Sequence, residues 1–156
     1  MKPDLFQAPD YYLLDELLTE EHKLVRDAAR AWVKKEVSPI IEDFAQRAEF
    51  PKQIVKGLGE IGGFGPYIPV EYGGAGLDYI SLVVALEEIA AGDGAISTIV
   101  SVQNSLPCGI TQRYGTDVQK QKYLSKLATG EWLGCFCLTE PQAGSDAGAL
   151  ECKAVR

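Results

Sequence analysis

Trp132 to Leu138 form an apolar run of strand length that stops abruptly at a Thr-Glu-Pro sequence. Aromatic and aliphatic side chains dominate the run, as they do in buried strands, and a polar loop follows it. The segments before the run show helical periodicity instead. The sequence therefore predicts a mainly α chain, with a helical domain over residues 1–131 and the first strand of a second domain within residues 132–156.

The loop after this run offers uncharged hydrogen-bond donors and unusual backbone shapes. Pro141 has no N–H and a fixed φ, whereas Gly144 and Gly148 can adopt conformations closed to other residues. Thr139 and Ser145 place hydroxyls beside backbone donors. Such a loop suits a ligand that accepts many neutral hydrogen bonds. An ordinary Gly/Pro/Ser turn at the end of a strand has the same residue types, so the loop alone leaves both interpretations open.

The composition is that of one globular domain, and its charge excludes some partners. The 156 residues are 46% hydrophobic and 24% charged, which is enough to bury a core. Fifteen basic and 22 acidic side chains give a net charge of −7. Because this charge repels phosphate backbones and anionic lipids, we expect no nucleic-acid partner.

The cysteines and the single histidine show no metal-ligand spacing. Cys108, Cys135, Cys137 and Cys152 lack a C-x-x-C pair, and His22 lies far from them, so no metal site is predicted. Free thiols fit a reducing compartment, and the first residues resemble neither a signal peptide nor a transit peptide. We therefore expect a cytoplasmic protein. We also expect His22 to be exposed in the first turn of a helix, without a catalytic role.

Apolar spacing and capping residues predict the helices. The predicted caps are Thr19, then Asp78 or Ser81, and Thr116, whose spacing to Gln119 is that of a capping box. The first helix is expected to carry Leu24, Ala28 and Trp32 on one apolar face and to reach Ser38-Pro39. The second is expected to begin at Phe50-Pro51 and to bury Ile54, Leu58 and Ile61. The third is expected to present Glu87 and Glu88 to solvent. Residues 62–78 are rich in Gly and Pro but carry apolar anchors, which indicates a packed loop.

No charged residue occurs between Asp93 and Arg113, yet polar side chains interrupt the segment. A membrane span needs about twenty predominantly apolar residues with fewer interruptions, so we expect no membrane span here. A central, buried helix fits better. Its polar residues are either hydrogen-bonded within the core or line a cavity for a mostly apolar ligand; they are Ser97, Thr98, Ser101, Gln103, Asn104 and Ser105.

The whole sequence of residues 133–148, Leu-Gly-Cys-Phe-Cys-Leu-Thr-Glu-Pro-Gln-Ala-Gly-Ser-Asp-Ala-Gly, resembles the flavin-binding signature of the acyl-CoA dehydrogenases. Residues 69–76, Pro-Val-Glu-Tyr-Gly-Gly-Ala-Gly, resemble a second segment of that family, and the likeness extends over nearly the whole chain. Residues 101–106 are most similar to the glutaryl-CoA dehydrogenase branch. The resemblance implies a helical domain, a middle β-barrel domain of which this chain holds only the opening, and a C-terminal helical domain that builds a homotetramer.

The resemblance also implies FAD as the cofactor. Phe136, Leu138 and Thr139 would lie along the isoalloxazine ring, with backbone N–H groups and the Thr139 hydroxyl bonding its N1/O2 edge. Donors there stabilise the negative charge of the reduced flavin. Gly144 and Ser145 would approach the FAD pyrophosphate, and Ser145 is also expected near the pantetheine of CoA.

Residues 97–106 would form a wall of the acyl pocket, with Ser97 and Thr98 as substrate-binding residues. The glutaryl branch places an arginine against the distal carboxylate of its substrate at the position that Ser97 occupies here. Burying a second carboxylate without such a partner is costly. We therefore expect a neutral acyl chain.

The activity implied by the resemblance is α,β-dehydrogenation of an acyl-CoA in fatty-acid or amino-acid catabolism, with electrons passed to an electron-transfer flavoprotein. The general base of the family is a glutamate of the C-terminal domain, which this chain lacks, so no catalytic residue is assigned. We expect the chain alone to be inactive and to belong to a longer protein. An acyl-CoA oxidase and a non-catalytic helical assembly module remain alternatives.

Overall fold

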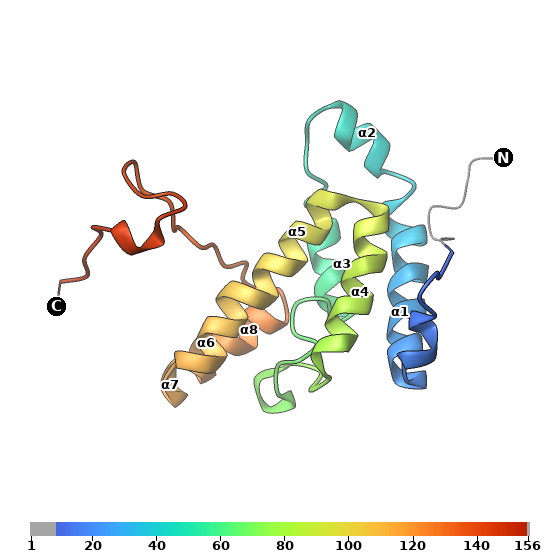
Figure 1. Cartoon of the computed structure of the whole chain (residues 1–156), viewed down its shortest axis with the longest axis horizontal. Coiled ribbons are helices and arrows are strands. Elements are labelled where there is room, and N and C mark those ends of the chain that lie inside the picture. The colour runs from blue at the N-terminus through green and yellow to red at the C-terminus, as the bar shows by residue number, and fades with distance from the viewer. Residues whose placement is uncertain (1–8, 156) are drawn as a thin grey trace.

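A computed structural model describes residues 9–155 as a group of packed helices followed by an extended tail (Figure 1). The α-helices are α1 (Glu20–Trp32), α2 (Ile41–Gln46), α3 (Ile54–Glu60), α4 (Tyr79–Gly92), α5 (Gly94–Gln103), α6 (Gly109–Tyr114), α7 (Asp117–Gln119) and α8 (Ser125–Ala128). Single 3-10 turns are η1 (Leu14–Leu17), η3 (Val70–Tyr72) and η6 (Ala147–Ala149), and π turns are η2 (Val33–Val37), η4 (Asn104–Cys108) and η5 (Lys120–Leu124). The predicted mainly α fold is confirmed for the described residues.

The starts of α1 and α4 are joined through one imidazole ring. As predicted, Thr19 caps α1: its Oγ1 accepts from His22 N at 3.2 Å, and His22 Nδ1 accepts from Thr19 N at 3.2 Å. The other ring nitrogen, Nε2, lies 2.9 Å from Asp78 Oδ2. The prediction of an exposed His22 was wrong, since the residue is 8% exposed and spans two helix starts.

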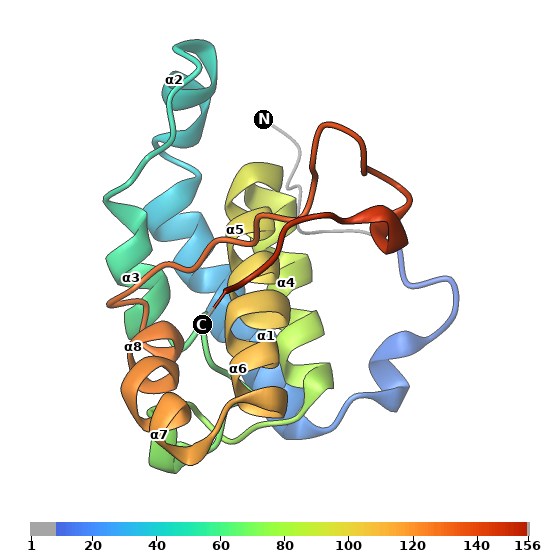
Figure 2. The same ribbon diagram turned by 90° about the vertical axis from the view of Figure 1, so that its left-hand side faces the viewer.

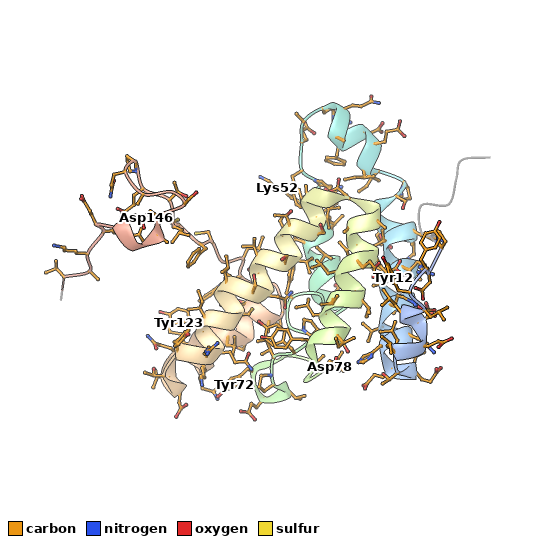
Figure 3. All side chains as sticks on the ribbon, viewed as in Figure 1. Tyr12, Lys52, Tyr72, Asp78, Tyr123 and Asp146 are labelled. Atoms are coloured by element: carbon orange, nitrogen blue, oxygen red, sulfur yellow. The ribbon has the colours of Figure 1, made fainter. Side chains whose placement is uncertain are left out.

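Asp78 caps α4, as the sequence predicts. Its Oδ1 accepts hydrogen bonds from Ser81 N at 2.8 Å and from Ser81 Oγ at 2.9 Å. Figure 3 shows Asp78 at the start of α4, far from the tail loop that carries Asp146. The Ser81 N–H, followed by the His22 ring, lowers the pKa of the Asp78 carboxyl to about 2.

A buried ion pair holds the last turn of α1 against α4, which lies beside it (Figure 1). Arg30 Nε donates to Glu88 Oε2 at 2.8 Å, and Arg30 Nη2 donates to Glu88 Oε1 at 2.6 Å. The prediction that Glu88 faces solvent was wrong, because the residue is only 5% exposed. A buried carboxylate is tolerated when both of its oxygens are bonded to a guanidinium, as they are here.

The core consists of two clusters of buried side chains. The first lies among α1, η2, α3, α4 and α5, and consists of Val33, Val37, Ile54, Leu58, Phe64, Ile89, Ile96 and Val100. The second joins the 62–78 loop to η4, η5 and α8, and consists of Tyr67, Ile68, Leu82, Cys108, Leu124, Leu127 and Ala128. Three residues that were expected on buried faces, Leu24, Ala28 and Ile61, are exposed. Leu24 lies off the face of α1 that buries Ala29, and Ile61 follows the last residue of α3.

The uncharged segment is a rod of three helical pieces, α5, η4 and α6, which follow one another in line (Figure 1). Asp93 caps it, with Oδ1 accepting from Ile96 N at 2.8 Å. Pro107, which lacks an N–H, lies in the π turn η4. None of the helices within residues 9–155 combines the length and hydropathy needed to cross a bilayer.

Candidate functional site

A hollow of about 560 Å³ lies between α4 and α5, and we call it the α4–α5 groove. Most of its lining is aliphatic, with three hydroxyls and one carboxylate; the residues are Val83, Leu86, Glu87, Ala90, Ser97, Thr98, Ser101 and Val102. The two predicted substrate-binding residues of α5 are therefore brought together in one concave surface. Apolar concave surfaces with a few polar groups are the usual sites for small ligands.

The polar groups of the groove already have local roles. Ser97 Oγ donates to Gly94 O at 2.9 Å, and Thr98 Oγ1 donates to the same carbonyl at 2.8 Å. Their oxygens remain free to accept hydrogen bonds from a ligand. Glu87 is exposed and is the charged member of the lining. The groove therefore repels a ligand that ends in a carboxylate.

Gln103 joins α5 to the chain that enters the tail. The residue is 1% exposed, and its Nε2 donates to Leu127 O at 2.8 Å and to Trp132 O at 2.9 Å. Its Oε1 accepts from Gly134 N at 2.9 Å. The sequence analysis left open whether the polar residues of this segment lie in the core or line a cavity. Both occur, since Gln103 is bonded within the core whereas Ser97 lines the groove.

The chain from 135 to 139 is an extended segment with unused donors. None of its backbone N–H groups forms a hydrogen bond within the described part of the chain, and the Thr139 hydroxyl has no partner there either. Phe136 is 46% exposed and Leu138 is 38% exposed. Gly134 anchors the start of the segment, since a Cβ there would lie 2.4 Å from Pro107 Cβ. The segment offers a row of neutral donors beside apolar side chains.

This segment does not form the buried strand that the sequence predicts. A strand needs a hydrogen-bonding neighbour, and in residues 9–155 the only β-bridge is the local one between Glu140 and Ala143. Figure 2 shows the tail crossing in front of α5 as a single extended chain. Within the described residues the segment is thus extended but unpaired, its apolar side chains lie on the surface, and the strand stays a prediction.

Gly144 and Ser145 lie on a loop that Glu140 closes, which we call the 140–152 loop. The Glu140 main chain exchanges two hydrogen bonds with Ala143, at 2.9 and 3.1 Å. Its carboxylate accepts from the N–H groups of Glu151, at 2.9 Å, and Cys152, at 3.1 Å. The first of these two bonds is the main cause of a lowered pKa at Glu140.

The predicted site residues fall into three groups in the structure. Ser97 and Thr98 share the α4–α5 groove; Phe136, Leu138 and Thr139 share the extended segment; Gly144 and Ser145 share the 140–152 loop. Ser145 is not among the residues that line the groove. Sequence reasoning missed the roles of Gln103 and Glu140, whose partners no local spacing reveals. Within residues 9–155, no three His, Cys, Asp or Glu side chains come together as metal ligands would.

Comparison with known proteins agrees with this arrangement. Residues 19–131 match the family model described as acyl-CoA dehydrogenase, N-terminal domain. A 3-(aryl)acrylate reductase of Clostridium sporogenes is 46% identical over 132 residues, which cover 85% of this chain and 35% of that protein. A short-chain specific acyl-CoA dehydrogenase of Clostridium acetobutylicum is 42% identical over 142 residues, covering 91% of this chain and 38% of that protein.

A solved structure shows the same fold. The glutaryl-CoA dehydrogenase of Mycobacterium smegmatis in complex with FADH2 superposes with a TM-score of 0.84 at 34% identity, over 89% of this chain and 36% of that one. The chain thus spans little more than a third of the length of the curated relatives it matches. The family model covers most of the sequence and the described fold, so the chain belongs to the acyl-CoA dehydrogenase family.

Proposed function

We propose that this chain is part of an FAD-dependent enzyme that acts on the Cα–Cβ bond of an acyl-CoA thioester, as an acyl-CoA dehydrogenase. The observation that carries the proposal is the row of unpaired N–H groups from 135 to 139, within the sequence that resembles the flavin signature. The names of the relatives support it: one is an acyl-CoA dehydrogenase, and one similar structure holds FADH2.

The residues of the extended segment and its loop suit a flavin. When bound, FAD would accept the hydride that leaves the β-carbon of the substrate. The backbone N–H groups of 135–139 and the Thr139 hydroxyl would donate to the polar edge of the ring, while Phe136 and Leu138 would cover its apolar part. Gly144 fits a close approach to the pyrophosphate, since a Cβ there would meet nothing within 4 Å. Ser145 would add a hydroxyl beside it.

The α4–α5 groove is the proposed site of the acyl chain, and its charge favours a neutral one. A carboxylate at the far end of the chain would face Glu87, and no basic residue among 9–155 lines the groove to pair with it. Ser97 and Thr98 would contact the chain through their hydroxyl oxygens. Ser145, outside the groove, would approach the CoA part of the substrate.

The larger assembly is likewise a proposal. Residues 1–131 would form the first domain, and residues 132–156 would begin a β-barrel domain whose neighbouring strands cover Phe136 and Leu138. An electron-transfer flavoprotein would receive the electrons, and the complete protein would be a homotetramer. The four free cysteines suit a reducing compartment such as the cytoplasm. Catalysis would further need a carboxylate base that this chain does not supply, so the chain by itself would be inactive.

A second candidate is the same chemistry in the opposite direction. The relative from Clostridium sporogenes is named a 3-(aryl)acrylate reductase. An enzyme of that kind adds hydrogen across a double bond next to a carbonyl, with the flavin as the donor. The two candidates share the flavin site and differ in which substrate changes the redox state of the flavin.

Anaerobic flavin spectroscopy of the protein that contains this chain tests both candidates. A dehydrogenase is expected to purify yellow and to lose its flavin absorbance when butyryl-CoA is added, but not with glutaryl-CoA. A reductase would instead keep its oxidised spectrum with butyryl-CoA, and its chemically reduced form would be reoxidised by an arylacrylate. Thr139→Val should slow flavin reduction about tenfold by removing one donor, whereas Thr111→Val should not. A colourless protein that takes up no FAD would overturn the proposal.

A further inference from the structure

Glu140 lies between the two groups of residues proposed to contact the flavin. Phe136, Leu138 and Thr139 precede it and would bind the ring, whereas Gly144 and Ser145 follow it and would bind the pyrophosphate. The separation of the two groups depends on how the chain turns between them. In the described structure, the side chain that fixes this turn is Glu140.

The carboxylate of Glu140 accepts three hydrogen bonds inside the loop. Oε2 accepts from Gln142 Nε2 at 2.6 Å and from Glu151 N at 2.9 Å, and Oε1 accepts from Cys152 N at 3.1 Å. The main-chain pair with Ala143 closes the tight turn at the same residue. One side chain thus holds both the beginning and the end of the 140–152 loop.

We propose that Glu140 is a positioning residue for the cofactor, and that its carboxylate keeps the 140–152 loop closed so that Thr139 and Ser145 are held in place for the flavin ring and the pyrophosphate. The inference rests on the proposed function. Glu140 itself need not touch the flavin. It acts through the backbone that carries the two hydroxyls.

The closing role requires the ionised form of the side chain. A carboxylate has only acceptor atoms, so each oxygen can meet an N–H, and such charge-assisted bonds are stronger than neutral ones. A protonated carboxyl or an amide places a donor opposite one of these N–H groups. The Glu151 N–H, then that of Cys152, lowers the pKa of Glu140. The carboxylate should therefore stabilise the closed loop fully above the ordinary glutamate pKa of 4.5, and the loop should open as the pH falls through the lowered pKa of Glu140.

Other ionisable groups of the loop do not share this network. Asp146 Oδ1 accepts from Gly148 N at 3.1 Å, within its own 3-10 turn. Glu151 and Cys152 contribute their backbone N–H groups, while their side chains are exposed. Glu140 has no ion pair within residues 9–155. Glu151→Gln thus removes the same charge from the same loop and leaves every described bond of Glu140 in place.

Amide hydrogen exchange tests the closing role without a flavin. In the complete protein at neutral pH, Glu140→Gln should speed exchange at residues 151 and 152 about tenfold, whereas Glu151→Gln should leave the amide of residue 152 unchanged. Lowering the pH from 6 through the lowered pKa of Glu140, below 4.5, should remove this protection in the original protein but not alter it further in Glu140→Gln, after correction for intrinsic exchange rates. Equal exchange in all three proteins would overturn the inference.

FAD titration tests the positioning role. In the original protein the dissociation constant for FAD should rise in acid. Glu140→Gln should raise this constant about tenfold at neutral pH and remove its dependence on pH, while Glu151→Gln should keep the affinity and the pH profile of the original protein. The far-UV circular dichroism of the helices should be the same in all variants. FAD affinity that is unchanged in Glu140→Gln would overturn this inference alone. Failure of the original protein to bind FAD would overturn the proposed function as well.

Discussion

Gln103 shows how much a single buried amide contributes to the arrangement of the site. Its two ends are not interchangeable: the NH2 group faces two carbonyl oxygens, and the oxygen faces an N–H. All three partners lie at least 24 residues further along the chain. An amide in this position is satisfied in only one orientation. The side chain therefore fixes where the chain leaves α8 and enters the extended segment.

Gln103→Glu tests this role with almost no change of shape. The new oxygen would face Leu127 O and Trp132 O, and a charge would be buried without a cation, so the free energy of unfolding should fall by about 3 kcal/mol. Urea unfolding followed by circular dichroism measures the change. Gln121→Glu, the same substitution at an exposed helical position, should alter stability by less than about 0.5 kcal/mol. Similar losses of unfolding free energy in Gln103→Glu and Gln121→Glu would show that the hydrogen bonds of Gln103 do not stabilise the fold more than an exposed position does.

Local residue spacing predicted the helix-capping residues correctly, but it did not predict contacts between residues that are far apart in the sequence. The caps Thr19, Asp78 and Thr116 were predicted because each bonds a backbone N–H three residues ahead. His22 was predicted to be exposed because it lies in the first turn of a helix, and Glu88 because it falls among the polar positions of the third helix. Their partners, Asp78 and Arg30, are 56 and 58 residues away in sequence, a distance that periodicity does not report.

At the scale of elements, the contact between α4 and η2, which continues α1, depends on a close approach at Gly92. A Cβ at this residue, the last of α4, would lie 2.3 Å from Cγ1 of the fully buried Val33. Valine is stiff at χ1, so it cannot rotate away without disturbing the core. Glycine is thus required at residue 92 because a Cβ would collide with η2, and not because of the backbone conformation.

Gly92→Ala should lower the free energy of unfolding by about 1–2 kcal/mol, because overpacking at Val33 exceeds the helix-forming advantage of alanine. Chemical denaturation of the 156-residue chain measures this. Gly94→Ala is the matched control: a Cβ there meets nothing within 4 Å, so stability should stay the same or rise by up to about 1 kcal/mol. A loss at Gly94 as large as that at Gly92 would contradict the packing argument.

Secondary-structure elements were predicted correctly where the local sequence carries a clear pattern. The helices and the packed 62–78 loop follow from apolar spacing, caps and Gly-Pro content. The π turns η2, η4 and η5 were not predicted, since a single extra residue in a turn barely changes that spacing. The strand at 132–138 was predicted from its composition alone. Composition gives a tendency, but a strand exists only when another strand binds it.

At the scale of the whole molecule, the four cysteines divide into one buried and three exposed residues. Cys108 is fully buried in the second core cluster, and burial raises the pKa of its thiol to about 12. Its Sγ donates to Phe64 O at 3.5 Å. Cys135, Cys137 and Cys152 are exposed on the tail. Because the thiolate is the reactive form, Cys108 should react only when the helical domain opens.

Thiol labelling of the 156-residue chain at pH 8 should therefore show two phases. Three thiols are expected to react quickly and Cys108 at least a hundredfold more slowly, on the order of the opening equilibrium of a stable domain. Mass spectrometry identifies the labelled residue, and Cys108→Ala should remove the slow phase alone. In concentrated urea, all four should react at one rate. Rapid labelling of Cys108 in the folded chain would show that the second core cluster is not closed.

The family and the helical fold could be recognised from the sequence because the motifs occur in the right order over most of its length. The relative placement of the groove, the extended segment and the 140–152 loop could not, because it depends on long-range bonds such as those of Gln103. This dependence has a mechanical consequence. Gln103 lies in the last turn of α5 and is hydrogen-bonded to the main chain at residues 132 and 134. A ligand wide enough to tilt α5 would therefore also displace residues 135–139. The size of the ligand in the groove therefore changes the position of the backbone N–H groups of residues 135–139.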